Sequence, residues 1–270
     1  MPIGTCKLCL KTKSLRRSHF LGRAVYKRLR NPRAPVKEPI SISRDVALLT
    51  SRQSVARLLC ADCEARFNSN GEDYVSKLMW SRDSFPLLDR LRVAPSIDFS
   101  LNEGVYSGRA VGIDTSRLAY FALSVLWRGA VNEWMLPTGG HIETLDLHGY
   151  EELLRTYLLG YSGFPKDAVV LVTVATDKKS QGVAYIPSES SYLGAYGFLV
   201  LGLHFHVFLG PKMPGWLRNS CCVSSTREPI CCRNIEEHTD RAMGQLARTA
   251  RVVGRLSQLE CIPPSELFRV

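Results

Sequence analysis

The sequence predicts an α+β protein, in which a small basic module held by a zinc ion precedes a larger domain of mixed helices and strands. Three observations support this prediction. Two Cys-x-x-Cys motifs lie within the first 63 residues. The excess of positive charge is confined to the same part of the chain. Beyond it, long apolar segments with helical spacing come before short apolar segments bounded by turns, which is typical of a mixed domain. We therefore divide the chain into a module at 1–95 and a second domain at 96–270.

The charge is distributed very unevenly along the 270 residues. The whole chain has 35 Lys and Arg against 25 Asp and Glu, a formal net charge of +10. Residues 1–80 hold 16 of the basic and 6 of the acidic residues, so the remaining 190 residues, with 19 of each, are neutral. A basic surface attracts polyanions, and nucleic acid is the most common of these inside cells. The first module is therefore expected to bind nucleic acid.

The two Cys-x-x-Cys motifs predict a metal site. About fifty residues separate the second cysteine of one motif from the first cysteine of the other, and four thiolates form a closed tetrahedral site for zinc. The ligands would be Cys6, Cys9, Cys60 and Cys63. The N-terminus lacks an apolar secretory segment, and no apolar run reaches the roughly 18 residues that span a bilayer. We therefore expect a cytoplasmic protein that does not enter a membrane, with its cysteines reduced.

The elements of the module follow from local patterns. Residues 4–13 indicate a zinc knuckle, and 14–31 a strand or turn around His19 followed by a short basic helix. The prolines of 32–57 indicate a loop or a weak hairpin. A helix is expected from near Cys63 through Phe67, with a break or cap at 68–71. More helix follows over 72–91, divided by Pro86.

The second domain begins with a hairpin-like connection over 94–113. The apolar stretch 115–136 predicts a buried helix capped by Thr115 or Ser116, in which Arg128 needs an internal salt-bridge partner. An amphipathic helix is expected next, followed by strands and a long polar helix. In order, these are the helix at 143–160, the strands at 168–176, 182–186 and 195–210, and the helix at 234–259.

The order of ligands in the module resembles the HNH endonucleases, also called ββα-metal or treble-clef nucleases. The matching residues are Cys6, Cys9, His19, Cys60 and Cys63, and the resemblance covers residues 4–80. It implies a treble-clef ββα-metal fold on structural Zn²⁺ and hydrolysis of phosphodiester bonds. His19 would be the general base, beside a catalytic Mg²⁺ or Mn²⁺. Basic residues around His19 would hold the nucleic acid, namely Arg16, Arg17, Arg23, Lys27, Arg28 and Arg30.

The sequence departs from the family pattern at both expected ligands of the catalytic metal. Ser18 stands where the family has Asp, and Glu64 stands where it has His. A carboxylate also binds Mg²⁺ or Mn²⁺, so Glu64 together with Asn68 or Glu72 is the predicted replacement. The alternative is a zinc-stabilised module that binds nucleic acid without cutting it. In either case DNA is favoured over RNA, and the second domain would serve target choice, control, or assembly with a protein partner or a second copy.

Two further groups of residues contain metal-ligand side chains. His204 and His206 are two positions apart on a predicted strand, so both point to one face, either as polar positions or as metal ligands. Two adjacent cysteine pairs with a histidine nearby offer a second zinc site, with one cysteine from each pair. These are Cys221, Cys222, Cys231, Cys232 and His238.

Overall fold

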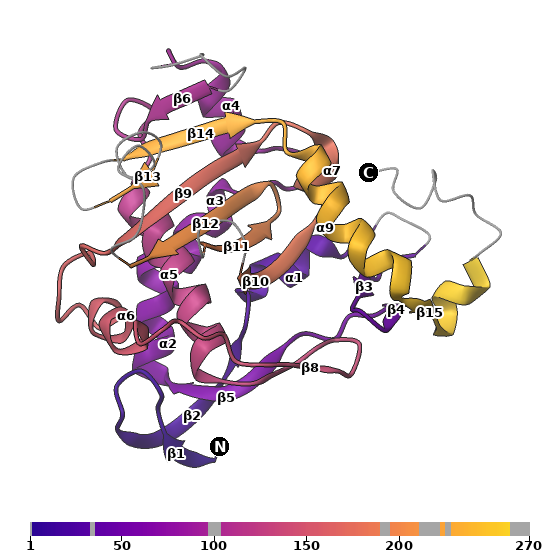
Figure 1. Ribbon diagram of the computed structural model, residues 1–270, viewed down its shortest axis with the longest axis horizontal. Helices are drawn as coiled ribbons and strands as arrows, with labels where there is room; N and C mark the ends of the chain where they lie inside the picture. Colours follow the sequence, from indigo (N-terminus) through magenta and orange to yellow (C-terminus); the bar gives the residue numbers. More distant parts are fainter. Residues whose placement is uncertain are drawn as a thin grey trace.

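A seven-stranded sheet forms the centre of the molecule (Figure 1). The structure is a computed structural model, and it describes residues 2–32, 36–96, 104–189, 195–210, 222–224 and 228–259. The sheet is antiparallel except where β14 runs parallel to β9. Its strands, in spatial order, are β10 (Ala184–Glu189), β11 (Ala195–Val200), β12 (Leu203–Leu209), β9 (Ala168–Ala175), β14 (Pro229–Arg233) and β6 (Gly104–Ser107), and β13 (Cys222–Val223) also pairs with β9. The protein is therefore of the mixed helix and strand class that the sequence predicts.

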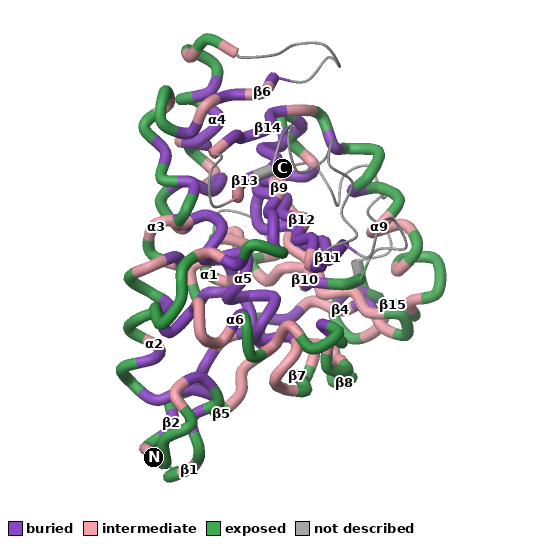
Figure 2. The backbone as a smooth tube through the Cα atoms, turned by 60° about the vertical axis from the view of Figure 1, so that its left-hand side comes forward, coloured by how far each residue is buried: buried purple, intermediate pink, exposed green. Residues whose placement is uncertain are grey.

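The helix α5 (Thr115–Val131) packs against one face of this sheet and is buried along most of its length (Figure 2). Phe121 of α5 contacts the rings of Phe198 and Phe205 on the sheet. The predicted buried helix is confirmed, but its predicted cap was wrong. The Asp114 carboxylate caps the helix by accepting hydrogen bonds from the N–H groups of the second and third residues of α5.

The N-terminal residues form a second, three-stranded sheet of β1 (Ile3–Thr5), β2 (Thr12–His19) and β5 (Val55–Cys60). The knuckle lies between β1 and β2, and α1 (Arg23–Leu29) follows β2. The helix α2 (Ala61–Phe67) begins directly after β5. The predicted knuckle, the strand at His19, the short basic helix and the helix at Cys63 are all confirmed.

Of the break or cap expected at 68–71, the structure has a cap at Asn68 but no break in the helical path. A π-helical turn, η1 (Asn68–Glu72), joins α2 to α3 (Asp73–Leu78) without interrupting the helical path. Gly71 lets this turn pack closely against α5, because a Cβ atom there would lie only 3.0 Å from the Cα atom of Phe121. Pro86 begins a separate helix, α4 (Pro86–Arg92), and so divides the following stretch as predicted.

The segment between the two cysteine motifs contains the predicted hairpin, formed by β3 (Ile40–Ile42) and β4 (Val46–Leu49). The helix expected over 234–259 is shorter: α9 (Glu236–Thr249) ends, and β15 (Arg251–Val252) then pairs in parallel with β4. A 3₁₀ helix, η2 (Gly254–Leu259), follows. Ala250 is extended, which allows the chain to join this edge instead of continuing the helix. Residues 251–252 are thus paired with a strand that lies between the two cysteine motifs.

Three other expectations need correction. Residues 195–210 form two strands rather than one, with Leu201 and Gly202 at positive φ in the tight turn between them. Residues 94–113 contribute β6, which pairs with β14 instead of forming a local hairpin. The helix of 143–160 is reduced to α6 (Glu151–Leu158). The remaining short elements are α7 (Lys178–Gln181), β7 (Trp134–Met135) and β8 (His141–Ile142).

One cluster of buried apolar side chains extends from the knuckle through α5 to the large sheet. It contains the apolar positions predicted for 72–91, including Val75 and Leu87. The division into units near residue 95 stays a prediction. Within the described ranges, no helix combines the length and the apolar character that a bilayer crossing requires.

Candidate metal centre and basic cleft

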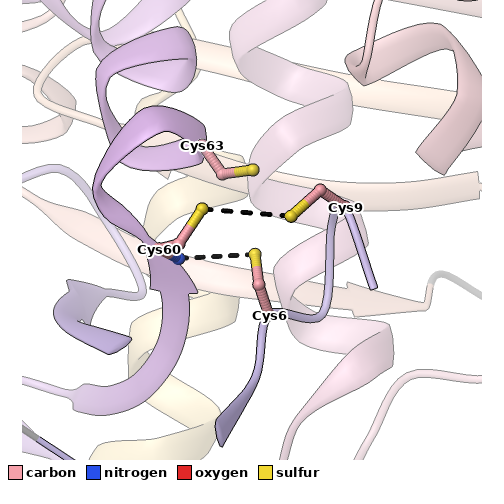
Figure 3. A group of neighbouring side chains, drawn as sticks. All are labelled: Cys6, Cys9, Cys60 and Cys63. Carbon is pink, nitrogen blue, oxygen red and sulfur yellow. Dashed lines mark hydrogen bonds between the residues drawn. The ribbon is translucent and has the colours of Figure 1, made fainter. Parts of the chain in front are cut away.

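The four cysteines of the two motifs come together at one point (Figure 3). Cys6 and Cys9 lie on the knuckle, whereas Cys60 ends β5 and Cys63 lies in the first turn of α2. Their sulfur atoms all lie within 4.8 Å of one another, and Cys9 Sγ is 3.9 Å from Cys60 Sγ. Zn–S bonds of about 2.3 Å in a tetrahedron place the sulfur atoms about 3.8 Å apart. The cluster therefore has the donor atoms and the spacing of a structural zinc site.

The closeness of the thiols shifts the pKa values of Cys6 and Cys63 in opposite directions. A hydrogen bond from Cys63 lowers the pKa of Cys6 to about 4, and the same contact raises the pKa of Cys63. Zinc binds thiolates, so its binding would displace the protons of the four thiols. The second half of the chain also supports the knuckle, because Arg155 of α6 donates a hydrogen bond of 2.8 Å to the Leu8 carbonyl. The site joins the knuckle to the start of α2.

Ser18 and His19 point to opposite sides of β2. Side chains alternate along a strand, so the residue next to the histidine faces the core. Ser18 is fully buried, and its hydroxyl donates to the Glu64 carboxylate while accepting a 3.2 Å hydrogen bond from the Leu59 N–H. His19 is half-buried and borders an open cleft. Ser18 and Glu64, the two residues at which the sequence departs from the HNH pattern, are therefore hydrogen-bonded to each other.

Glu64 and Glu72 lie on the inner side of the α2–η1 segment with Arg128. The wider π turn brings residues eight positions apart close to one face, since two turns then span about eight residues. Arg128, only 1% exposed, donates to the Glu72 carboxylate, and its guanidinium stacks 4.7 Å above the Phe67 ring. Burial raises the pKa of Glu64, and the charge of Arg128 opposes that rise. This group, made of the buried Ser18 and Arg128 and the partly buried Glu64 and Glu72, is called the inner cluster below.

The inner cluster bears directly on the predicted catalytic metal. Ser18 donates to Glu64, Arg128 neutralises Glu72, and Asn68 is exposed. Among the described residues, the groups of three or more acidic, Cys or His side chains able to hold a metal are the four cysteines and a histidine cluster on the large sheet. Neither group includes His19 or Glu64, and the Mg²⁺ or Mn²⁺ site stays a prediction.

The cleft beside His19 is basic. It has a volume of about 700 Å³, and its lining contains no acidic residue. The polar lining is supplied by β2, the start of α1 and the loop before β5, and the apolar lining by β5 and the β7 region. The residues are Arg17, His19, Arg23, Ser51, Arg52, Gln53, Val55, Met135 and Leu136. We call this the arginine cleft.

Burial lowers the pKa of His19, although a hydrogen bond that the imidazole donates to the Gln53 side chain partly opposes this effect. The imidazole is therefore neutral at pH 7 and able to accept a proton. Its location at the rim of a positively charged cleft is the arrangement that acid–base chemistry on a bound anion requires.

The other predicted basic residues are distributed around the cleft. Arg17 and Arg23 line it, while Arg16, Lys27 and Arg30 are exposed. Arg28 instead donates hydrogen bonds to the carbonyl groups of Met79 and Trp80, at 2.9 and 3.2 Å. The set of predicted binding residues did not include Arg52 and Gln53, because they lie in the segment expected to be a loop or a weak hairpin. The pairing of His19 with Val55 brings that segment beside β2.

No protein-family description, no curated protein and no solved structure matches this chain. The resemblance to HNH endonucleases therefore rests on the residues of the module alone.

Proposed function

We propose that this protein is a zinc-stabilised, HNH-like endonuclease that hydrolyses phosphodiester bonds of nucleic acid in the arginine cleft. The observation that carries the proposal is the placement of a neutral histidine, His19, in one cleft with Arg17, Arg23 and Arg52. A phosphodiester carries the negative charge that such a cleft attracts. The imidazole supplies the proton acceptor that hydrolysis needs.

The arrangement of elements around the four cysteines supports a treble-clef ββα scaffold. A knuckle is followed by the antiparallel strands β2 and β5, and the helix α2 starts at the second cysteine motif. Zinc at this point would fix β2 relative to α2, and so would hold His19 and the wall formed by Val55 in place. The metal has a structural role here, because four protein ligands leave no open coordination position.

In the proposed reaction, each side chain of the arginine cleft has a role that follows from its chemistry. His19 accepts a proton from the attacking water or hydroxyl group, and Gln53 orients the ring. The guanidinium groups of Arg17, Arg23 and Arg52 neutralise the phosphate as negative charge develops on it. Val55, Met135 and Leu136 provide an apolar wall for a sugar or base. No step is assigned to a second metal, because both carboxylates of the inner cluster are engaged within the chain.

The test is cleavage of end-labelled DNA and RNA by the full chain, with EDTA, Mg²⁺ or Mn²⁺ in separate reactions. We expect His19→Ala to lower the cleavage rate by about 10²- to 10⁴-fold, the range typical of a lost general base. Arg248→Ala, an exposed change on α9, is the control and should cut normally. Because the pKa of His19 is lowered, kcat/KM should rise with pH, with a midpoint below the ordinary histidine value of about 6.5. Normal cleavage by a folded, zinc-bound His19→Ala protein would refute the assignment.

The inner cluster favours a second candidate, a module that binds nucleic acid without turnover. Its carboxylates would be structural, as the contacts of Glu64 with Ser18 and of Glu72 with Arg128 indicate. In that case, binding would weaken steeply with salt, while none of the cleavage reactions would yield product. The same set of assays therefore separates the two candidates.

A further inference from the structure

Three histidines from distant parts of the chain meet on the face of the large sheet opposite α5. His204 and His206 are two positions apart on β12, so both point to this face, and His238 approaches from α9. A ligand nitrogen from each ring lies within 4.8 Å of the others, and the ring centres of His204 and His206 are 4.2 Å apart. We call these three residues the histidine cluster.

The surrounding residues leave room for this cluster and hold it in place. Gly197 of β11 is paired with His206, and a Cβ atom there would lie 3.3 Å from the His206 ring. The absence of a side chain at Gly197 therefore lets the rings lie side by side. Helix α9 is held against the same face by a 2.7 Å hydrogen bond between Ser180 and Thr239. Thr239 is the neighbour of His238, so this contact fixes the approach of the third ring.

The cluster contains nitrogen atoms that protein groups do not satisfy. The Nδ1 atoms of His204 and His206 are buried and have no hydrogen-bond partner among the described residues. The Tyr185 hydroxyl is 2.9 Å from His204 Nε2 and 3.2 Å from His238 Nε2. A network built on this hydroxyl alone satisfies those two atoms and leaves both Nδ1 atoms unpaired. Buried polar atoms of this kind usually have a partner, and a bound metal ion would supply one.

Burial keeps the three rings in the uncharged form. Burial, followed by the charge of neighbouring histidines, holds the pKa of His204 well below its ordinary value and that of His206 at about 4. The pKa of His238 is also lowered by burial. The rings are thus neutral at pH 7, and neutral imidazole is the form that binds transition metals.

We propose that His204, His206 and His238 bind a divalent transition-metal ion, separate from the zinc of the four cysteines. Imidazole donors suit zinc, copper, nickel and iron. The experiment below uses Zn²⁺. Three protein ligands leave at least one coordination position for water or another ligand, as in catalytic rather than structural zinc sites. The ion can enter on the side of His238, because this residue is exposed. The expected pairing of His238 with the cysteine pairs is not found for Cys231 and Cys232; Cys221 and the side chain of Cys222 lie outside the described residues.

The experiment measures bound zinc in the full chain, by mass spectrometry of the metal and by titration against a competing chelator. The wild-type chain should hold one zinc more than His206→Ala and His238→Ala, whose affinity at this site should fall by at least about tenfold. His141→Ala, an exposed histidine on β8, is the matched control and should keep the full zinc content. Tyr185→Phe removes the hydroxyl but no imidazole, so it should also keep the second zinc.

X-ray absorption of the zinc-loaded wild type provides a reading that does not depend on any variant folding. Both sulfur and nitrogen neighbours should surround the bound zinc, because two different sites are occupied. A wild-type chain that binds a single zinc with sulfur neighbours alone, even at saturating Zn²⁺, would overturn the proposal. Circular dichroism of His206→Ala and His238→Ala confirms that any loss of zinc does not reflect unfolding.

Discussion

The inner cluster and the arginine cleft lie on the two sides of strand β2, and their charged residues are arranged differently. Inside, each carboxylate has a partner: Glu72 is paired with Arg128, and Glu64 with Ser18. Outside, Arg17, Arg23 and Arg52 line a cleft without an acidic residue. Buried charges need partners within the protein, whereas an open site can leave its charge for a ligand. The difference separates structural polar residues from those available for binding.

A residue near the expected position of a family ligand need not have the family role, because the two faces of a strand lie in different environments. Ser18 and His19 are adjacent in sequence, but strand alternation places one in each environment. Arg128 comes from α5 in the predicted second domain, and it puts a fixed positive charge beside Glu72, a predicted metal ligand. Both halves of the chain therefore contribute to the inner cluster, while the polar lining of the arginine cleft is supplied by the first 53 residues.

The largest change should come from the scaffold that supports both sides. Cys63→Ser removes one of four sulfur ligands, and structural zinc contributes about 10–16 kcal/mol in zinc-finger peptides. We expect loss of zinc from the cysteine site and a loss of several kcal/mol in stability. Thermal unfolding and zinc content measure the two effects. Cys232→Ala, at a buried cysteine outside the site, is the control and should cost only about 1 kcal/mol while keeping that zinc. Equal zinc content in both proteins would show that the four cysteines do not bind it.

The next largest effect should separate the inner cluster from the cleft. Arg128→Met leaves the partly buried Glu72 without its positive partner, which should cost up to about 3 kcal/mol, because some exposure of Glu72 reduces the penalty of an unpaired charge. Adding Glu72→Gln should recover most of that loss, because the unpaired charge is then removed. Urea unfolding at pH 7 gives these values, and Arg66→Met, an exposed change on α2, should shift stability by less than about 0.5 kcal/mol. A full loss that persists in the double variant would mean that packing on Phe67, not charge, dominates at Arg128.

How far the sequence reveals each feature depends on how local the contacts are. The cysteine cluster was predictable because each motif places two ligands in one turn, leaving only one long-range pairing to infer. The sequence also showed that Arg128 needs a partner, but not that Glu72 would be that partner. That contact depends on the π turn at Asn68–Glu72, for which the local sequence carries no clear signal.

Pairings between distant segments were the least predictable. The strand β6 pairs with β14 more than 120 residues later in the chain, so no local pattern marks it as part of the large sheet. The histidine cluster has the same origin, since the i, i+2 spacing of His204 and His206 was visible while the approach of His238 on α9 was not. Arg52 was similarly hidden, because its role depends on the pairing of β5 with β2.

The smallest expected effect, and the sharpest test of the open side, is the salt dependence of binding. Arg52→Ala should weaken binding of nucleic acid similarly for all sequences, and should lower the slope of log K against log salt by about one, as expected for one lost phosphate contact. Fluorescence anisotropy with a labelled duplex, with both variants made in a His19→Ala background to prevent cleavage, measures the slope. Arg248→Ala carries the same loss of charge on a distant helix and should leave the slope unchanged. If both variants change it equally, net charge rather than the arginine cleft attracts the nucleic acid.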